Sequence, residues 1–223
     1  MTHNPTRAGR LLAAGLLALA ACSCASQPTD PGVALDQKRS EAARIASRGK
    51  QAQQAGRLRE AVDLYLQSLD TFDQLPGVRT NLGVALMDSG DILKGSDMFK
   101  EEVQLFPATA QGALTNLGII YKDARQFVTA RDYFFRALEL TPNDPLALRG
   151  AVESCMATDY DEEKTLDLVL RGLMVERDPK ELKNTRKVFD DYAQNMKAVY
   201  TQSIVEALLD IGTSHLQLFQ SPQ

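Results

Sequence analysis

The side chains best suited to chemistry are few and scattered in this sequence of 223 residues. It has three cysteines, Cys22, Cys24 and Cys155, and its two histidines, His3 and His215, lie near opposite ends of the chain. A histidine-centred metal site or nucleophile needs partners at set positions, and neither histidine has a visible one. The sequence also lacks a phosphate-cradling glycine loop, a His-Glu-x-x-His motif and a Cys-x-x-Cys motif. We therefore predict no catalytic residue, metal or cofactor, and expect Cys155 to be a small buried hydrophobic residue.

One acidic cluster, Asp159, Asp161, Glu162 and Glu163, precedes a predicted helix. Such carboxylates could hold a cation or act as the acid and base of an enzyme. Carboxylates at a helix N-terminus also stabilise the helix dipole, and we expect that role here. An enzyme that uses Asp159 and Glu163 is the remote alternative.

Composition and charge exclude several classes of protein. The chain has 25 Lys and Arg against 29 Asp and Glu, a net charge of −4, with 44% hydrophobic and 6% aromatic residues. The hydrophobic share is sufficient for a packed core, which argues against a disordered chain. Three cysteines cannot make a disulfide framework. A slightly acidic chain is a poor nucleic-acid binder, because phosphate binding needs a basic face.

The N-terminal segment, 1–21, has the pattern of an export signal. Arg7 and Arg10 precede an unbroken run of Leu, Ala and Gly at 11–21, which is too short for a membrane span of about 20 residues and suits the apolar part of a signal peptide. Leu19-Ala20-Ala21-Cys22 follows and resembles the lipobox of bacterial lipoproteins. The resemblance implies a signal peptide at 1–21 and lipidation of Cys22, whose acyl chains would anchor the protein stably in a membrane.

The expected location follows from the residue after that cysteine. In well-studied Gram-negative families Asp at this place retains a lipoprotein in the inner membrane, and here it is Ser23. The resemblance thus implies a cell-envelope protein in the outer membrane, facing the periplasm. Cleavage near Ser23-Cys24-Ala25 would instead give a secreted protein, and that alternative stays open. Pro, Gly and polar residues predict a lipidated N-terminus and flexible tether at 22–36.

The middle of the chain repeats with spacings of 34 and 35 residues. Three columns share both spacings: Gly49, Gly83 and Gly118; Ala61, Gly95 and Ala130; and Tyr65, Phe99 and Phe134. Pro107 and Pro142 are also 35 residues apart. Several columns that recur with one period indicate a repeat architecture.

These columns resemble the tetratricopeptide repeat (TPR), a helix-turn-helix unit. The resemblance implies that the glycines let the second helix approach the first, that the small residue and the ring form the core, and that the prolines end the second helix. We predict an all-α TPR helix-turn-helix solenoid at 37–178, with repeats near 42–75, 76–110 and 111–144 and a degenerate unit at 145–178. C-terminal capping helices are predicted at 179–219, because the last unit would otherwise expose its apolar side. A generic helical bundle is the alternative.

Three residues depart from the TPR pattern. Gly56 and Gly90 occupy the turn between the helices of the first two repeats, whereas Arg125 holds that place in the third, so we expect its turn to differ. Gly95 is expected to weaken its helix by about 1 kcal/mol relative to Ala. Asp73 stands where the pattern places a helix-ending proline.

In the TPR family the first helices line a concave groove that holds a peptide or a partner helix. The resemblance assigns this partner-binding groove to nine residues: Lys50, Thr80, Val84, Met87, Asp88, Thr115, Ile119, Lys122 and Asp123. One subgroup clamps a C-terminal carboxylate with Lys and Asn at places where this chain has Thr80, Val84, Thr115 and Ile119, so that clamp is absent. Val84 and Ile119, one repeat apart, suit an amphipathic segment instead.

The expected function is a non-catalytic scaffold, a membrane-anchored TPR lipoprotein that binds protein partners in the cell envelope and no nucleic acid. The layout resembles lipoproteins that assist assembly of a secretin or pilus. It also resembles regulators of cell-wall hydrolases and proteins that aid outer-membrane protein insertion, and these alternatives stay open.

Overall fold

The computed structural model describes residues 30–158, 160–175, 183–184, 186–188 and 190–192. Eight helices have both ends within the described residues: α1 Pro31–Gln54, α2 Leu58–Thr71, α3 Val78–Asp88, α4 Ile92–Leu105, α5 Gln111–Asp123, α6 Phe127–Leu140, α7 Pro145–Met156 and α8 Glu162–Val175. The described residues between 183 and 192 are also helical. The described residues contain no strand. The all-α prediction is confirmed.

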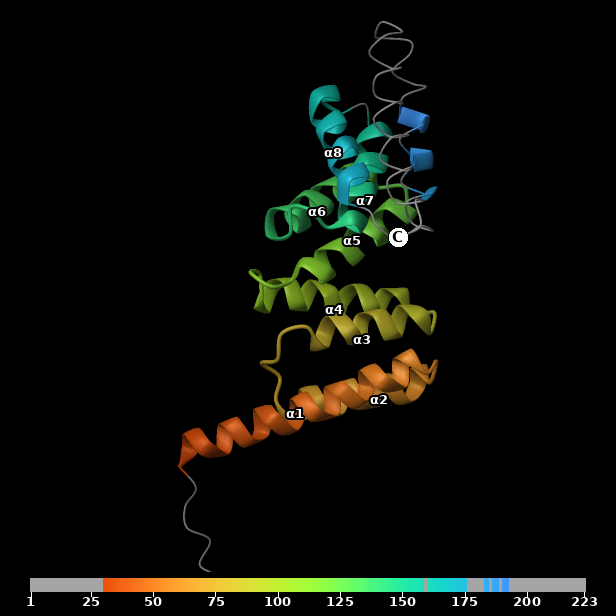
Figure 1. Ribbon diagram of the computed structural model, residues 1–223. Coiled ribbons are helices and arrows are strands. Elements are labelled where there is room, and N and C mark those ends of the chain that lie inside the picture. The colour runs from red at the N-terminus through yellow and green to blue at the C-terminus, as the bar shows by residue number, and fades with distance from the viewer. Residues whose placement is uncertain (1–29, 159, 176–182, 185, 189, 193–223) are drawn as a thin grey trace, which may run out of the picture.

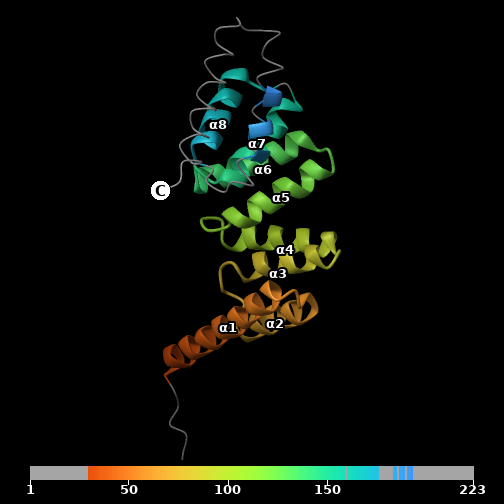
Figure 2. The ribbon, with the colours of Figure 1, turned by 45° about the vertical axis from the view of Figure 1, so that its right-hand side comes forward.

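The helices form four pairs that stack into an elongated array (Figures 1 and 2). Each helix packs against the next one along the chain, and the first helices of successive pairs also contact one another, α1 with α3, α3 with α5 and α5 with α7. Among the described residues no contact joins the second helices α2, α4, α6 and α8 to each other. The first helices therefore form the inner face of the array, which is the geometry of the predicted TPR solenoid.

The turn inside each of the first three pairs has the same backbone. Its central residue is in the left-handed region, with φ of 74° at Gly56, 92° at Gly90 and 58° at Arg125. The next amide in each turn donates to the carbonyl five residues earlier, at 2.9, 2.9 and 2.8 Å, which is the helix-ending Schellman pattern. The expectation that the turn at Arg125 differs is wrong, because the Schellman bonds impose one backbone on all three turns.

Rings pack on glycines at the centre of each of the first three pairs. A Cβ on Gly83 would lie 2.5 Å from the Phe99 ring, and equivalent clashes with Tyr65 and Phe134 would arise at Gly49 and Gly118. Tyr65, Phe99 and Phe134 are fully buried. These glycines are therefore needed for the close approach of the paired helices, as the TPR resemblance predicts.

Gly95, predicted to weaken its helix, has a packing role. A Cβ there would lie 2.8 Å from the carbonyl oxygen of Gly83 and 2.8 Å from Cγ of Met87. Helix α4 thus rests directly on the backbone of α3. Glycine lowers the helix propensity at this position, but only a residue without a Cβ permits the close contact between the two helices.

The hydrophobic core consists of three clusters along the array. The first lies between α1, α2 and α3, the second surrounds Phe99 and Leu117, and the third surrounds Phe134 and Leu148. Tyr192 is buried in the third cluster. Most of the predicted capping segment at 179–219 lies outside the described residues, so the capping role stays a prediction.

Helix α1 begins at Pro31, before the predicted start of the TPR array at residue 37. Asp30 is its N-cap and accepts a hydrogen bond from the Gly32 amide at 3.0 Å, and Pro31 takes the first helical position. The flexible tether predicted to extend to residue 36 is therefore wrong for residues 31–36, which are helical. Asp-Pro-Gly is a common loop signal, but Asp before Pro also starts a helix.

Candidate functional site on the inner face

All nine predicted groove residues lie on first helices, and so on the helices that form the inner face of the array. Lys50 is on α1; four residues are on α3 and four on α5. Lys50, Asp88 and Asp123 are exposed, and five of the others are half-buried. The helices position these side chains because residues four apart share a helix face.

Thr115 is the exception among the nine. It is 3% exposed, and its hydroxyl accepts a hydrogen bond from Nε2 of Gln111 at 3.1 Å. It therefore offers almost no surface to a partner, and its assignment to the groove is corrected. Helix α5 contacts the four helices α3, α4, α6 and α7. Thr115 is therefore buried, although a groove position on a first helix could otherwise be exposed.

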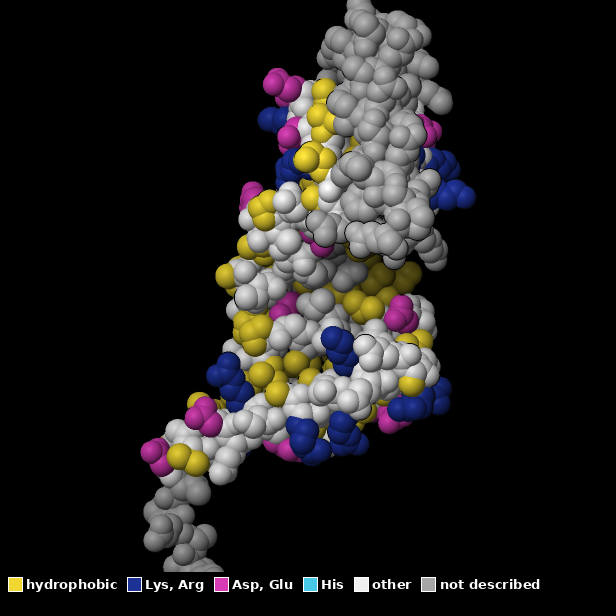
Figure 3. Space-filling model, in the orientation of Figure 1, with side chains coloured by type: hydrophobic (Ala, Val, Ile, Leu, Met, Phe, Trp, Pro, Cys, Tyr) yellow, Lys and Arg dark blue, Asp and Glu magenta, His cyan; other side chains and the backbone are white. Residues whose placement is uncertain are grey.

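The middle of the inner face is apolar. Val84 and Met87 on α3 pack against the cluster around Phe99, and Ile119 on α5 packs against the cluster around Phe134. All three remain half-buried. Hydrophobic side chains line a hollow between the α3–α4 pair and α5 (Figure 3). The inner face therefore has an apolar strip that spans two repeats.

Polar contacts connect the first helices at both ends of this strip. Nε2 of Gln53 on α1 donates to Oδ2 of Asp88 on α3 at 3.4 Å, and the Tyr65 hydroxyl donates to Gln53 at 3.0 Å. On the other side, Nζ of Lys122 on α5 lies 2.5 Å from Oε2 of Glu153 on α7. Two of the predicted groove residues, Asp88 and Lys122, thus make polar contacts between neighbouring repeats.

Glu153 is an inner-face residue that the sequence analysis missed. It has the place in the fourth unit that Val84 and Ile119 have in the second and third, so extending this column by one period would have found it. The column Lys50, Val84, Ile119 and Glu153 crosses all four first helices. Its middle is apolar and its two ends are charged.

A buried acidic side chain fixes the start of α3. Glu102 on α4 is 1% exposed, and its Oε1 accepts the Gly77 amide at 2.6 Å, directly before α3. Its Oε2 has no hydrogen-bond partner within the described residues. Burial raises the pKa of the Glu102 carboxyl, and the hydrogen bond from Gly77 and the charge of Arg79 oppose this rise. Glu102 therefore positions the helix that carries Val84 and Met87.

The other candidate residues show structural roles where they are described. Cys155 is a free, fully buried cysteine whose thiol pKa is raised by burial, which confirms the expected packing role. Oδ1 of Asp161 accepts the Lys164 amide at 3.0 Å at the start of α8, as the helix-terminus interpretation predicts. Asp159 lies outside the described residues. In the described part of the chain, no group of three or more His, Cys, Asp or Glu side chains could hold a metal ion.

The N-terminal features fall outside this description. Cys22, Cys24, the predicted signal peptide and both histidines belong to residues that the structure does not describe. None of the described helices is both long and apolar enough to span a bilayer. Lipidation and location therefore stay predictions.

Comparison with solved structures identifies the fold as that of TPR proteins. A structure titled "MamA 41-end from Desulfovibrio magneticus RS-1" has a TM-score of 0.60 and 16% identity, covering 81% of this chain and 97% of that one. MamA from AMB-1 has a TM-score of 0.57 and 19% identity, covering 82% and 94%. The first TPR domain of Spaghetti (RPAP3), bound to the HSP90 peptide SRMEEVD, has a TM-score of 0.50 and 21% identity, covering 53% and 93%. No protein-family model and no curated protein matches the sequence.

Proposed function

We propose that this protein is a non-catalytic scaffold that binds a partner protein along the inner face of its TPR array. The observation that carries the proposal is the column Lys50, Val84, Ile119 and Glu153, with its apolar middle and charged ends. An amphipathic helix or extended segment would place its apolar side on Val84, Met87 and Ile119, excluding water from them.

The ends of the column set the expected charge of the partner. Lys50 is exposed and has no ion-pair partner within the described residues, whereas Glu153 is already paired with Lys122. The partner segment should therefore carry an acidic residue near α1 and need no charge near α7. The RPAP3 domain holds a peptide in its structure, but the proposal rests on this chain's own residues, since the likeness supports only the fold.

The N-terminal sequence bears on where in the cell the protein is located. We propose that acyl chains on Cys22 hold the protein in the cell envelope, in the outer membrane facing the periplasm, where it assists assembly of an envelope complex such as a secretin or pilus. The support is the sequence Leu19-Ala20-Ala21-Cys22-Ser23 and its resemblance to the lipobox.

Replacing two apolar groove residues with arginine tests the binding surface. We expect the double variant Val84→Arg, Ile119→Arg to lose partner capture, because each guanidinium would occupy the strip while its stem stays on the apolar surface. Capture is measured by crosslinking and pull-down from the native envelope, with proteins quantified by mass spectrometry. Circular dichroism melting of the purified variant checks that the array is still folded.

The matched control places the same charges outside the groove. Leu93 and Val128 are 80% and 54% exposed, lie on the second helices α4 and α6, and are also one repeat apart. Leu93→Arg, Val128→Arg should retain every partner that the groove variant loses. Equal capture by the unchanged protein and both variants would place the binding surface elsewhere.

A further inference from the structure

Two exposed carboxylates lie beside the apolar strip of the inner face. Asp88 is four residues after Val84 on α3, and Asp123 is four residues after Ile119 on α5. Residues four apart share a helix face, so each carboxylate lies on the same side of its helix as the apolar residue before it. Asp88 and Asp123 are one repeat apart, and their helices contact each other. Two negative charges therefore flank the strip, next to the turns within the second and third pairs.

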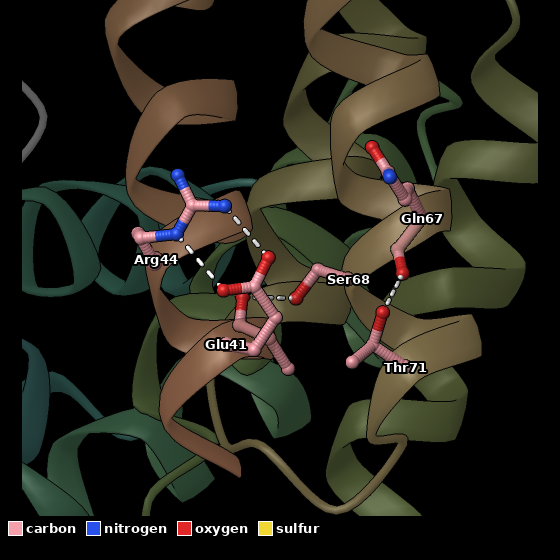
Figure 4. A network of polar contacts seen from close by, with 6 residues as sticks. Glu41, Arg44, Gln67, Ser68 and Thr71 are labelled. Atoms are coloured by element: carbon pink, nitrogen blue, oxygen red, sulfur yellow. Dashed lines mark hydrogen bonds and ion pairs between the residues drawn. The ribbon is translucent and has the colours of Figure 1, made fainter. Parts of the chain in front are cut away.

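Several exposed carboxylates elsewhere on the array are neutralised by a partner on their own helix. Glu41 accepts two hydrogen bonds from Arg44, of 2.9 and 2.7 Å (Figure 4). Oδ1 of Asp97 lies 3.3 Å from Nζ of Lys100, again three residues away. Such a pair leaves little net charge for a partner protein to recognise.

Asp88 and Asp123 have no such partner. Asp88 accepts a hydrogen bond of 3.4 Å from the side-chain amide of Gln53, which carries no charge. Neither aspartate forms an ion pair within the described residues, and Lys122, beside Asp123, is paired with Glu153. Both aspartate side chains are exposed. Unpaired charges of one sign on a surface attract an oppositely charged partner.

The places of these carboxylates on their helices are unfavourable for stability. Asp88 is the last residue of α3, and Asp123 is the last residue of α5. The C-terminal end of a helix carries partial negative charge, which favours basic side chains and disfavours acidic ones. Arg125, in the turn after α5, is exposed and forms no ion pair with Asp123. The two aspartates therefore add to the negative potential at this edge of the groove and do not stabilise their helices.

From these charges we infer that the groove holds a basic amphipathic segment of another protein. The apolar side of the segment covers Val84 and Ile119, its Lys or Arg side chains pair with Asp88 and Asp123, and its acidic residue lies near Lys50. The inference rests on the proposed function, because it names the kind of partner that the same groove binds.

The distance between the two helices sets the spacing of the basic residues in the partner. Helices that pack side by side have axes about 8–10 Å apart, and seven residues of an α-helix rise about 10 Å. In a helical partner that crosses α3 and α5, basic residues seven positions apart would therefore meet both aspartates. Residues with this spacing lie on one helix face, so they can flank the apolar side of the segment.

Selection from a displayed library of random peptides tests the inference without a known partner. The protein is the chain from residue 22 onward with Cys22→Ser, which keeps every described residue. Peptides that bind this protein, but not its Val84→Arg, Ile119→Arg variant, depend on the groove. We expect these peptides to be enriched in Lys and Arg relative to the starting library. The charge-reversed protein Asp88→Lys, Asp123→Lys should instead enrich Asp and Glu.

The affinity for one synthesised groove-dependent peptide, measured by fluorescence anisotropy, then gives the contribution of the two aspartates. Asp88→Asn, Asp123→Asn should bind it about tenfold more weakly, at about threefold per lost ion pair, and this difference should shrink as salt is raised. The variant should remain folded, because it removes negative charge from two helix C-termini. The matched control, Asp97→Asn, Asp132→Asn, removes the same charge from the second helices α4 and α6, also one repeat apart, and should bind like the unchanged protein.

The outcomes separate this inference from the proposed function. Groove-dependent peptides without an excess of basic residues, or equal weakening by the two asparagine variants, would overturn the inference and leave the proposed function standing. Self-association that Val84→Arg, Ile119→Arg abolishes, detected by analytical ultracentrifugation, would identify a second copy of the chain as the occupant and overturn it too. A selection in which no peptide depends on Val84 and Ile119 would contradict the proposed function together with the inference.

Discussion

Single residues hold the array together where a ring meets a glycine. The Phe99 ring occupies the space that a Cβ on Gly83 would need, and the Phe134 ring is in the same relation to both Gly118 and Gly150. The separation along the chain between the glycine and its ring is the same in each of the first three pairs. Gly150 follows Phe134 by that same separation, and its contact with the ring joins the third pair to α7.

The substitution Gly83→Ala should therefore destabilise the protein. Overpacking against the Phe99 ring costs about 1–3 kcal/mol, and the better helix propensity of Ala returns up to about 1 kcal/mol. We expect a net loss of about 1–2 kcal/mol in the free energy of unfolding, measured by urea denaturation. Gly112→Ala is the control, because its Cβ would make an ordinary contact of 3.5 Å with Thr80. A loss in both variants would mean that the ring contact is not the cause.

A repeat pattern does not predict which individual polar residues are buried. Thr115 and Ile119 are both groove positions by their spacing, yet one is buried and the other half-buried. Glu102 is buried inside the array, where it accepts the backbone amide of Gly77 from the segment before α3. This contact joins residues 25 positions apart, and no local sequence signal marks it.

At the scale of elements, the turn at Arg125 shows how the fold overrides the backbone preference of a single residue. The left-handed backbone costs a residue with a Cβ about 1–2 kcal/mol more than glycine. Glycine occupies this place at 56 and 90, and the Schellman hydrogen bonds impose the same backbone on Arg125. The third turn therefore stores strain that the first two lack.

Arg125→Gly should consequently stabilise the protein. Relief of the left-handed strain exceeds the additional backbone entropy of glycine in the unfolded chain, so we expect a gain of about 0.5–1 kcal/mol. The reverse change, Gly90→Ala, should destabilise by about 1 kcal/mol. Both are measured as shifts of the urea midpoint. A loss of stability in Arg125→Gly would show that the exposed arginine side chain makes a contribution larger than the strain.

At the start of α1, too, the packing of the helix decides between two local conformations. Pro31-Gly32 is predicted from the sequence to belong to the flexible tether, but Asp30 caps the helix and Pro31 begins it. The result is a helix whose N-terminal part projects from the array. Asp before Pro fits both a turn and a helix start, and the packing of the later part of α1 on α2 favours the helix.

For the whole molecule, the proposed anchor makes a prediction about processing. If Cys22 is lipidated, the mature protein lacks residues 1–21, gains the mass of its acyl chains and fractionates with membranes. Cys22→Ser should leave an unprocessed or soluble form, because the thiol that accepts the diacylglyceryl group is gone. Intact mass and membrane fractionation measure both effects, and Cys24→Ser is the matched control. Unchanged mass and fractionation in Cys22→Ser would refute lipidation.

The sequence alone determined the fold, because one period repeated in several columns specifies one packing unit, and the structure confirms the TPR solenoid. The tertiary structure was needed to show which groove positions are accessible and how Lys122 and Glu153 join adjacent repeats. These depend on distances between helices, which a one-dimensional pattern does not contain. The same holds for the projection of α1, which is the first helix of the array and is longer than the helix with which it pairs.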